Sequence, residues 1–283
     1  MIRPLLFCCP LALFLAGSIA HGQDKIEFPQ PSQHSLVRQR VGLTDIEVDY
    51  SRPNKNNREV FGGVVPWDKA WRTGANASTK VRFSDAVKFG DKDVPAGEYA
   101  LFTIPKTNDW TIILSKNAEL PYKEGADVAR VTVTPVKLGD EVETFTIGFQ
   151  DLRIDHATMF LAWDKTAVPV TIQTHDIEKV TQQIDGAVKS GRELDPNFYN
   201  SAAGFYLDQN KDLKQAAEWI NKAIEKSPDA YFMFTRKAQI EAKLGNKKEA
   251  IAAAEKSNQI LESRPERDEA AIRNNRQLID SLR

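Results

Sequence analysis

The residues best suited to chemistry are concentrated between positions 49 and 76, where three arginines and two tryptophans lie among several glycines. Arginine presents a planar fork of donors that matches carboxylate or phosphate groups. Tryptophan presents a flat face to a sugar ring or a cation. Such a combination would suit a shallow polar pocket for a glycan or a small anion. The candidate ligand-binding residues are Arg52, Arg58, Trp67, Trp71, Arg72 and Asn76.

The same residues also have a purely structural interpretation. The tryptophans would then fill a core, and the arginines would pair with Asp49, Asp68 or backbone carbonyl groups across a long connection. Buried polar groups need such partners, because an unpaired one is costly. The sequence leaves both interpretations open.

No familiar catalytic motif accompanies this stretch, since Gly-x-Gly-x-x-Gly, Walker, Gly-x-Ser-x-Gly and His-Glu-x-x-His patterns are all lacking. The histidines at positions 34, 156 and 175 are far apart and share no metal-ligand spacing. We therefore expect no metal and no cofactor, and we favour a binding role over catalysis. One alternative is a glycan hydrolase that uses carboxylates of this region, such as Asp49 and Glu59. Another alternative is a structural scaffold.

The N-terminus has the pattern of an export signal. Arg3 precedes an apolar run, and small residues follow it, so residues 1–22 are predicted to be a signal peptide. The only two cysteines, Cys8 and Cys9, lie inside this segment, so the mature chain would contain no thiol. We expect an exported protein, periplasmic or extracellular in a Gram-negative bacterium, with no membrane anchor after cleavage.

The overall charge is close to balance. The chain has 38 Lys and Arg residues against 39 Asp and Glu residues, which gives a net charge of −1 at pH 7. No basic stripe stands out along the sequence. Nucleic acid is therefore not an expected partner.

Residues 35–174, which follow a linker at 23–34, alternate between apolar and polar side chains. Ile46, Val48 and Tyr50 show this period of two clearly. Such alternation places one face of a strand on a core and the other face in water. Many short segments of this kind, with turn residues between them, predict an all-β domain that is an antiparallel sandwich or barrel.

The pattern changes to a helical period in residues 175–283. This region also repeats itself at an interval of 34 residues, so that Gly204 corresponds to Ala238 and Ala216 corresponds to Ala250. That interval is the length of a tetratricopeptide (TPR) repeat. We expect a TPR-like helical array with a C-terminal capping helix, which would bind a protein or peptide. The alternative is an unrelated helical bundle.

Several strings in the β-rich region resemble one protein family. The string Trp71-Arg72-Thr73-Gly74-Ala75-Asn76 is the most specific of them. Others are Tyr50-Ser51-Arg52-Pro53, Phe61-Gly62-Gly63, Ala96-Gly97-x-Tyr99, Phe102-x-Ile104-Pro105 and Trp110-Thr111-Ile112. Over about residues 30–173 the chain is similar to the exported bacterial family called domain of unknown function 2911.

The resemblance implies a signal peptide and a β domain, sometimes followed by TPR-like helices, and it implies no established activity. Members of the family usually carry a longer connection after the strand that begins at Trp110. In this chain the corresponding segment, residues 117–125, is short. Any site that depends on that connection is therefore not expected here.

Overall fold

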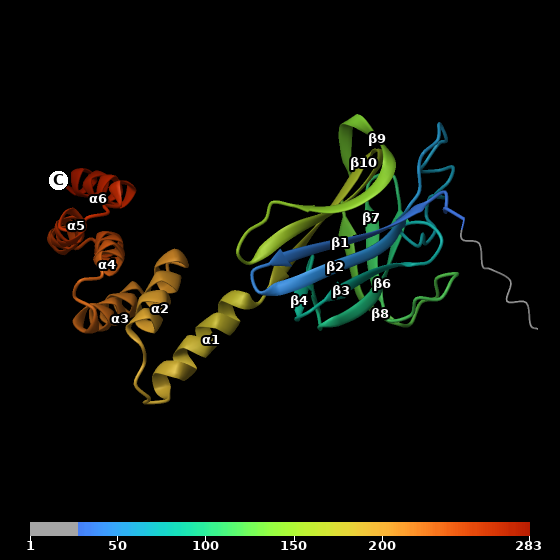
Figure 1. Cartoon of the computed structure of the whole chain (residues 1–283). Coiled ribbons are helices and arrows are strands. Elements are labelled where there is room, and N and C mark those ends of the chain that lie inside the picture. The colour runs from blue at the N-terminus through green and yellow to red at the C-terminus, as the bar shows by residue number, and fades with distance from the viewer. Residues whose placement is uncertain (1–27) are drawn as a thin grey trace, which may run out of the picture. The chain divides into compact units, whose positions relative to one another are not determined.

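The computed structural model describes residues 28–283, so the predicted signal peptide and the first part of the predicted linker lie outside the described residues. The chain forms two compact units that divide between Thr174 and His175. The first unit contains the strands and the second contains the helices (Figure 1). Among the described residues, no helix is both long enough and apolar enough to cross a membrane.

A six-stranded antiparallel sheet forms one layer of the first unit. Its apolar positions alternate as the sequence predicts, so that Ile46, Val48 and Tyr50 are buried while the residues between them are not. The strand order is β1-β2-β3-β6-β7-β8. These strands are β1 (Gln33–Val41), β2 (Thr44–Arg52), β3 (Thr79–Phe83), β6 (Gly97–Pro105), β7 (Trp110–Ser115) and β8 (Asp127–Val133).

A four-stranded antiparallel sheet, with the order β5-β4-β10-β9, forms the second layer. The long strands β9 and β10 pair along most of their length, and the short hairpin of β4 and β5 extends the sheet beside β10. The strands are β4 (Val87–Phe89), β5 (Lys92–Val94), β9 (Val136–Gln150) and β10 (His156–Thr174).

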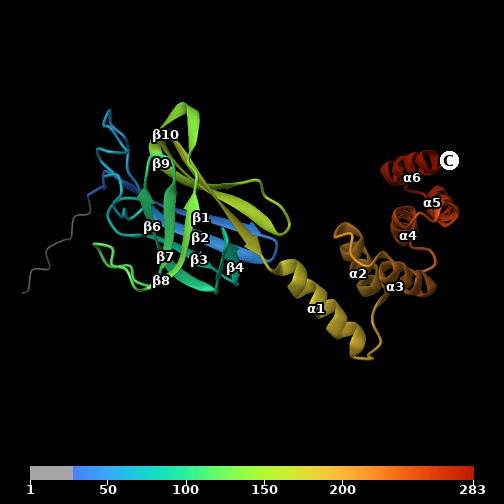
Figure 2. The same cartoon turned by 180° about the vertical axis from the view of Figure 1, so that it is seen from behind.

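The two sheets lie face to face (Figure 2). They enclose one hydrophobic core, to which both contribute buried side chains. Tyr50 of β2 connects the layers directly. Its hydroxyl donates to the carbonyl oxygen of Ile147 in β9 at 3.2 Å and accepts from the Ile147 amide at 2.9 Å. The all-β prediction is confirmed, and the architecture is a sandwich.

Strand β10 contains the irregularity that shapes one end of the sandwich. Its register with β9 shifts on both sides of Asp164, and Asp164 has a left-handed backbone with φ of 52°. Such register shifts mark a β-bulge, in which an extra residue bends the strand and redirects its side chains. The sequence pattern indicates separate strands at 158–163 and 168–171, whereas the structure has one continuous strand with a bulge between them.

The second unit consists, within the described residues, of six helices. Helices α2, α4 and α6 contact one another in chain order, and α3 and α5 pack against them. Ala216 and Ala250, which are 34 residues apart, are both fully buried. The helices are α1 (Asp176–Lys189), α2 (Pro196–Asp208), α3 (Leu213–Lys226), α4 (Tyr231–Leu244), α5 (Lys247–Glu262) and α6 (Glu269–Leu282). The prediction of a β domain followed by a helical domain is confirmed.

Candidate ligand-binding site

The loop of residues 53–78 connects β2 to β3 and is attached to both sheets. Trp71 exchanges two backbone hydrogen bonds with Thr103 of β6, at 2.7 and 2.9 Å. The amide of Phe145 in β9 donates to the carbonyl oxygen of Pro53 at 2.9 Å. These bonds satisfy backbone groups that would otherwise be unpaired. The loop therefore has a defined path over this end of the sandwich.

Two glycines allow a tight turn in this loop. Gly62 has φ of 98°, a region that residues with a Cβ atom rarely adopt. A Cβ atom on Gly62 would lie 2.7 Å from Nε1 of Trp67, and one on Gly63 would collide with the carbonyl oxygen of Glu59. Gly62 thus lets the Trp67 indole lie directly against the turn, and Gly63 lets the chain pass close to the backbone of Glu59.

An aromatic cluster joins the loop to the core. The ring of Phe61 meets the edge of Trp110 with 4.9 Å between centroids, and Trp71 stacks on Trp163 at 5.8 Å. Trp67 packs beside Phe61 at 6.1 Å and remains 40% exposed. Trp67 is therefore the solvent-facing end of a cluster whose other members lie deeper in the sandwich.

A hollow of about 300 Å³ lies beside Trp67. Three lysines line it, and each comes from a different segment: Lys106 from the β6–β7 turn, Lys137 from β9 and Lys165 from the bulge of β10. Within the described part of the chain, none of these ammonium groups forms an ion pair. The remaining lining residues are Thr107, Trp110, Pro135, Val136 and Thr166.

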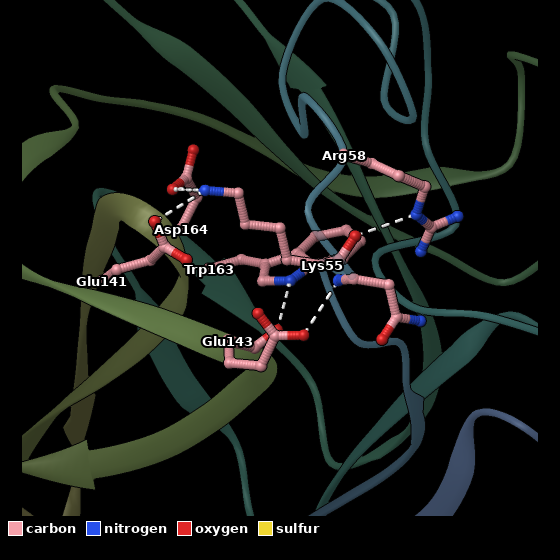
Figure 3. A network of polar contacts seen from close by, with 7 residues as sticks. Lys55, Arg58, Glu141, Glu143, Trp163 and Asp164 are labelled. Carbon is pink, nitrogen blue, oxygen red and sulfur yellow. Dashed lines mark hydrogen bonds and ion pairs between the residues drawn. The ribbon is translucent and has the colours of Figure 1, made fainter.

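A fourth lysine, Lys55, holds the bulge in place (Figure 3). Its Nζ donates to Oε2 of Glu141 at 2.7 Å and to Oδ1 of Asp164 at 2.8 Å. These hydrogen bonds raise the pKa of Lys55, first the bond to Asp164 and then the bond to Glu141. Lys55 is therefore a charged cross-link and not a general base. It fixes Asp164, whose neighbour Lys165 lines the hollow.

Glu143 of β9 completes this polar network. Its side-chain Oε1 accepts a hydrogen bond from the amide of Asn56 at 2.8 Å. Its backbone carbonyl oxygen accepts from the amide of Lys55 and from Nε1 of Trp163, at 2.8 and 3.1 Å. Arg58, also drawn in Figure 3, donates to the carbonyl oxygens of Lys55 and Asn54. The network connects the loop to β9 and β10.

The remaining arginines predicted from the sequence also donate to backbone carbonyl groups. Arg52 donates from Nε to the carbonyl oxygen of Phe145 at 3.0 Å, and from Nη2 to Oγ1 of Thr146 at 2.7 Å. Arg72 donates from Nη1 to the carbonyl oxygen of Asn76 at 2.9 Å. These contacts match the structural interpretation that the sequence leaves open for the arginines.

The other candidate residues have separate positions. Asn76 has φ of 58°, and its Nδ2 donates to Oγ of Ser51 at 3.2 Å. Trp71 is half-buried in the aromatic cluster, and its Nε1 donates to the carbonyl oxygen of Gly74 at 3.1 Å. Trp67 is the candidate that lines the hollow. The three lysines of the hollow were not found by sequence reasoning, because no motif connects their distant positions.

The carboxylates considered for catalysis do not line this hollow. Asp49 lies on β2 and pairs with His34 at 2.9 Å, and Glu59 belongs to the glycine turn. Within residues 28–283, no group of three or more His, Cys, Asp or Glu side chains could hold a metal ion. The chemistry offered by the hollow is therefore that of cationic and aromatic side chains.

The fold and this hollow define a class, namely a β-sandwich domain with a lysine-lined aromatic hollow at one end, followed by a helical domain. Residues 32–172 match the model of the family described as "Protein of unknown function (DUF2911)". The match spans nearly the whole β domain and confirms the resemblance found in its sequence. No curated protein and no solved structure matches the chain.

Proposed function

We propose that the β domain is a non-enzymatic binding domain for an anionic sugar, such as one residue of an acidic glycan. The observation that carries this proposal is the group of three lysines, none of which forms an ion pair, around the exposed face of Trp67. Clustered charges of one sign attract a ligand of the opposite sign. The indole face offers apolar surface to a sugar ring.

The dimensions of the hollow support a small ligand. Its volume of about 300 Å³ lies at the lower end of the range typical of small-molecule sites. A single charged sugar residue suits this size better than a long chain does. The Lys55 cross-link supports the proposal as well, because it fixes the segment that carries Lys165 before any ligand arrives.

Binding is favoured over glycan hydrolysis by the composition of the site. Glycoside hydrolysis generally uses two carboxyl groups that flank the scissile bond. None of the residues that line the hollow is an aspartate or a glutamate. The lysines would instead hold a carboxylate, sulfate or phosphate group of the ligand.

We also propose that the chain is exported to a bacterial envelope. The support is the Arg3 start, the apolar run and the small residues near position 22. Mass spectrometry of protein from an envelope fraction tests this, with a mature start expected at His21 or Gln23. An intact Met1 would contradict it.

The helical domain is proposed to be TPR-like and to dock a protein or a peptide. Support comes from the 34-residue repeat and from the layer formed by α2, α4 and α6. Stacked helix pairs of this kind create extended concave binding surfaces.

A thermal-shift screen tests the sugar-binding proposal. Mature protein is heated with uronic acids, sulfated sugars, sugar phosphates and their neutral counterparts. A ligand that binds only the folded state raises the melting temperature. We expect anionic sugars to stabilise the protein and neutral ones to have little effect. Stabilisation by neutral sugars alone, or by none of the sugars, would contradict the proposal.

A further inference from the structure

One face of α4 carries two cations that have no acidic partner in contact. Arg236 and Lys243 are seven positions apart and lie on the side of α4 that meets α2. Arg236 donates from Nη1 to the carbonyl oxygen of Asn200 at 2.8 Å, and Lys243 donates to that of Leu207 at 3.0 Å. Within residues 28–283, neither side chain forms an ion pair.

Arg236 is held close to the backbone of α2. A Cβ atom on Gly204 would lie 2.8 Å from Cζ of Arg236, so the absence of a side chain there makes room for the guanidinium. Burial lowers the pKa of Arg236, and the negative charge of Asp208 offsets only part of this effect. The guanidinium has lost hydration without gaining a carboxylate in contact.

A second observation lies at the same seam. Asn200 of α2 is 8% exposed, and its Oδ1 has no hydrogen-bond partner among the described residues. Buried polar atoms of this kind are rare in folded proteins, and each needs an explanation. The contact between α2 and α4 therefore contains a cation with no carboxylate in contact and an amide oxygen that can accept from an N–H group but not from a carboxylate.

The same face of α4 continues into a groove against α6. Gln239, three positions after Arg236, lines a hollow of about 430 Å³. Thr235 lines it as well, from the part of α4 that contacts Ser257 of α5. The other walls of the hollow carry uncharged side chains of α6, of which Asn274, Gln277 and Ser281 are polar and Ala271 and Leu278 are apolar. Asn275 is buried and already donates to Ser257 and Asn258.

We propose that this face binds an extended acidic segment of another protein. A carboxylate of the partner would accept hydrogen bonds from the guanidinium donors of Arg236 that Asn200 does not use. The amide side chains of Gln239, Asn274 and Gln277 would pair with the partner's peptide backbone. Charge-assisted hydrogen bonds between arginine and a carboxylate are stronger than neutral ones. This inference rests on the proposed peptide-docking role of the helices, and it adds the chemistry of the partner.

The test is an array of short peptides in which aspartate is replaced stepwise by asparagine, probed with the mature full-length chain. We expect the retained protein to increase with aspartate content. The Arg236→Gln variant should lose most of this dependence, and Lys243→Gln should lose part of it. Lys237→Gln is the matched control, because Lys237 lines a separate hollow between α4 and α5. A double Lys106→Gln, Lys165→Gln variant shows whether the lysines of the β domain contribute to retention on the acidic peptides.

The outcomes separate the inference from the proposed function. Aspartate-dependent retention that Arg236→Gln abolishes, with Lys237→Gln and the double variant unchanged, supports the inference. Retention that ignores aspartate content overturns the inference and leaves peptide docking intact. Retention lost only in the double variant also overturns it, since the β domain then holds the acidic peptides. Absence of retention contradicts both. Urea unfolding of the Arg236→Gln variant checks that it is folded. If Arg236→Gln is unfolded, the aspartate dependence of retention in Lys243→Gln is the test instead.

Discussion

The two arginines at positions 52 and 72 differ in their contacts, so their replacement by methionine should have different effects. Arg52 is half-buried and extends from β2 to β9, where it makes two hydrogen bonds to different residues. Arg72 is exposed and makes one hydrogen bond within its own loop, to Asn76. The free energy of unfolding should therefore fall much more in Arg52→Met than in Arg72→Met.

The magnitudes follow from the number and exposure of these bonds. A hydrogen bond to a charged group contributes about 1.5–3 kcal/mol. Two such bonds, reduced for partial exposure, give an expected loss of about 2–4 kcal/mol for Arg52→Met. The single exposed bond of Arg72 gives about 0.5–1 kcal/mol. Methionine keeps part of the aliphatic packing, so the loss reports mainly on the polar contacts.

Urea unfolding of each variant, followed by tryptophan emission, measures the difference. Four of the five tryptophans lie in the β domain, at positions 67, 71, 110 and 163, so the signal reports mainly on this domain. Arg82→Met, at an exposed position of β3, is the control and should change stability by less than about 0.5 kcal/mol. Equal losses at positions 52 and 72, or a larger loss at 72, would refute the reasoning.

Three further predictions concern the network, the pH dependence and the domain boundary. Lys55→Gln should weaken sugar binding by about 2- to 30-fold in calorimetry, because Lys165 loses its positioning; unchanged affinity would contradict this. Burial, followed by the bond to Asp127, raises the pKa of Tyr122 from 10.0 to about 12. As the pH rises, Tyr122 therefore ionises in the unfolded state before it does so in the folded state, and the free energy of unfolding should fall between pH 10 and about 12. The free energy of unfolding should fall less over this pH range in Tyr122→Phe than in the wild type. An identical pH dependence in the two proteins would contradict the assignment to Tyr122. Residues 28–174 alone should give a β-type circular dichroism spectrum, whereas an unfolded fragment would show that the helices complete its core.

The sandwich could be predicted from alternation because each long strand has one buried face. β2, with Ile46, Val48 and Tyr50 inside, is a clear example. The hairpin of β4 and β5 could not be predicted in this way, since three residues per strand are too few to show a period. The bulge at Asp164 was likewise missed, because it depends on pairing with β9 and not on local propensity.

The helical domain shows a similar division between local and tertiary signals. In the sequence, Asp195 and Ser227 each stand directly before a proline, a pattern that predicts a helix start after each of them. Asp195 does cap α2, because its side chain accepts from the amide of Asn197 at 2.7 Å. The second start is wrong, because α4 begins at Tyr231. The carbonyl oxygen of Ser227 accepts from Ala230, and this turn delays the helix by three residues.

The candidate site was predicted only in part. Trp67 was identified from its residue type, and the structure places it at the hollow. The lysines that give the hollow its charge come from three separate segments, and only tertiary pairing brings them together. Single lysines in a sequence are usually solvated surface residues, so no local signal distinguishes these three.

The measurement that tests the central claim most directly is a calorimetric titration of mature protein with the best uronic acid from the screen and with its neutral methyl ester. We expect the acid to bind and the ester to bind much more weakly. Trp67→Ala should abolish most binding. The double variant Lys106→Gln, Lys165→Gln should weaken it by up to about thirtyfold, at roughly 1 kcal/mol per exposed charge. Lys116→Gln, an exposed lysine outside the hollow, should behave as wild type. Equal affinity for acid and ester, or unchanged affinity in the double variant, would contradict the account.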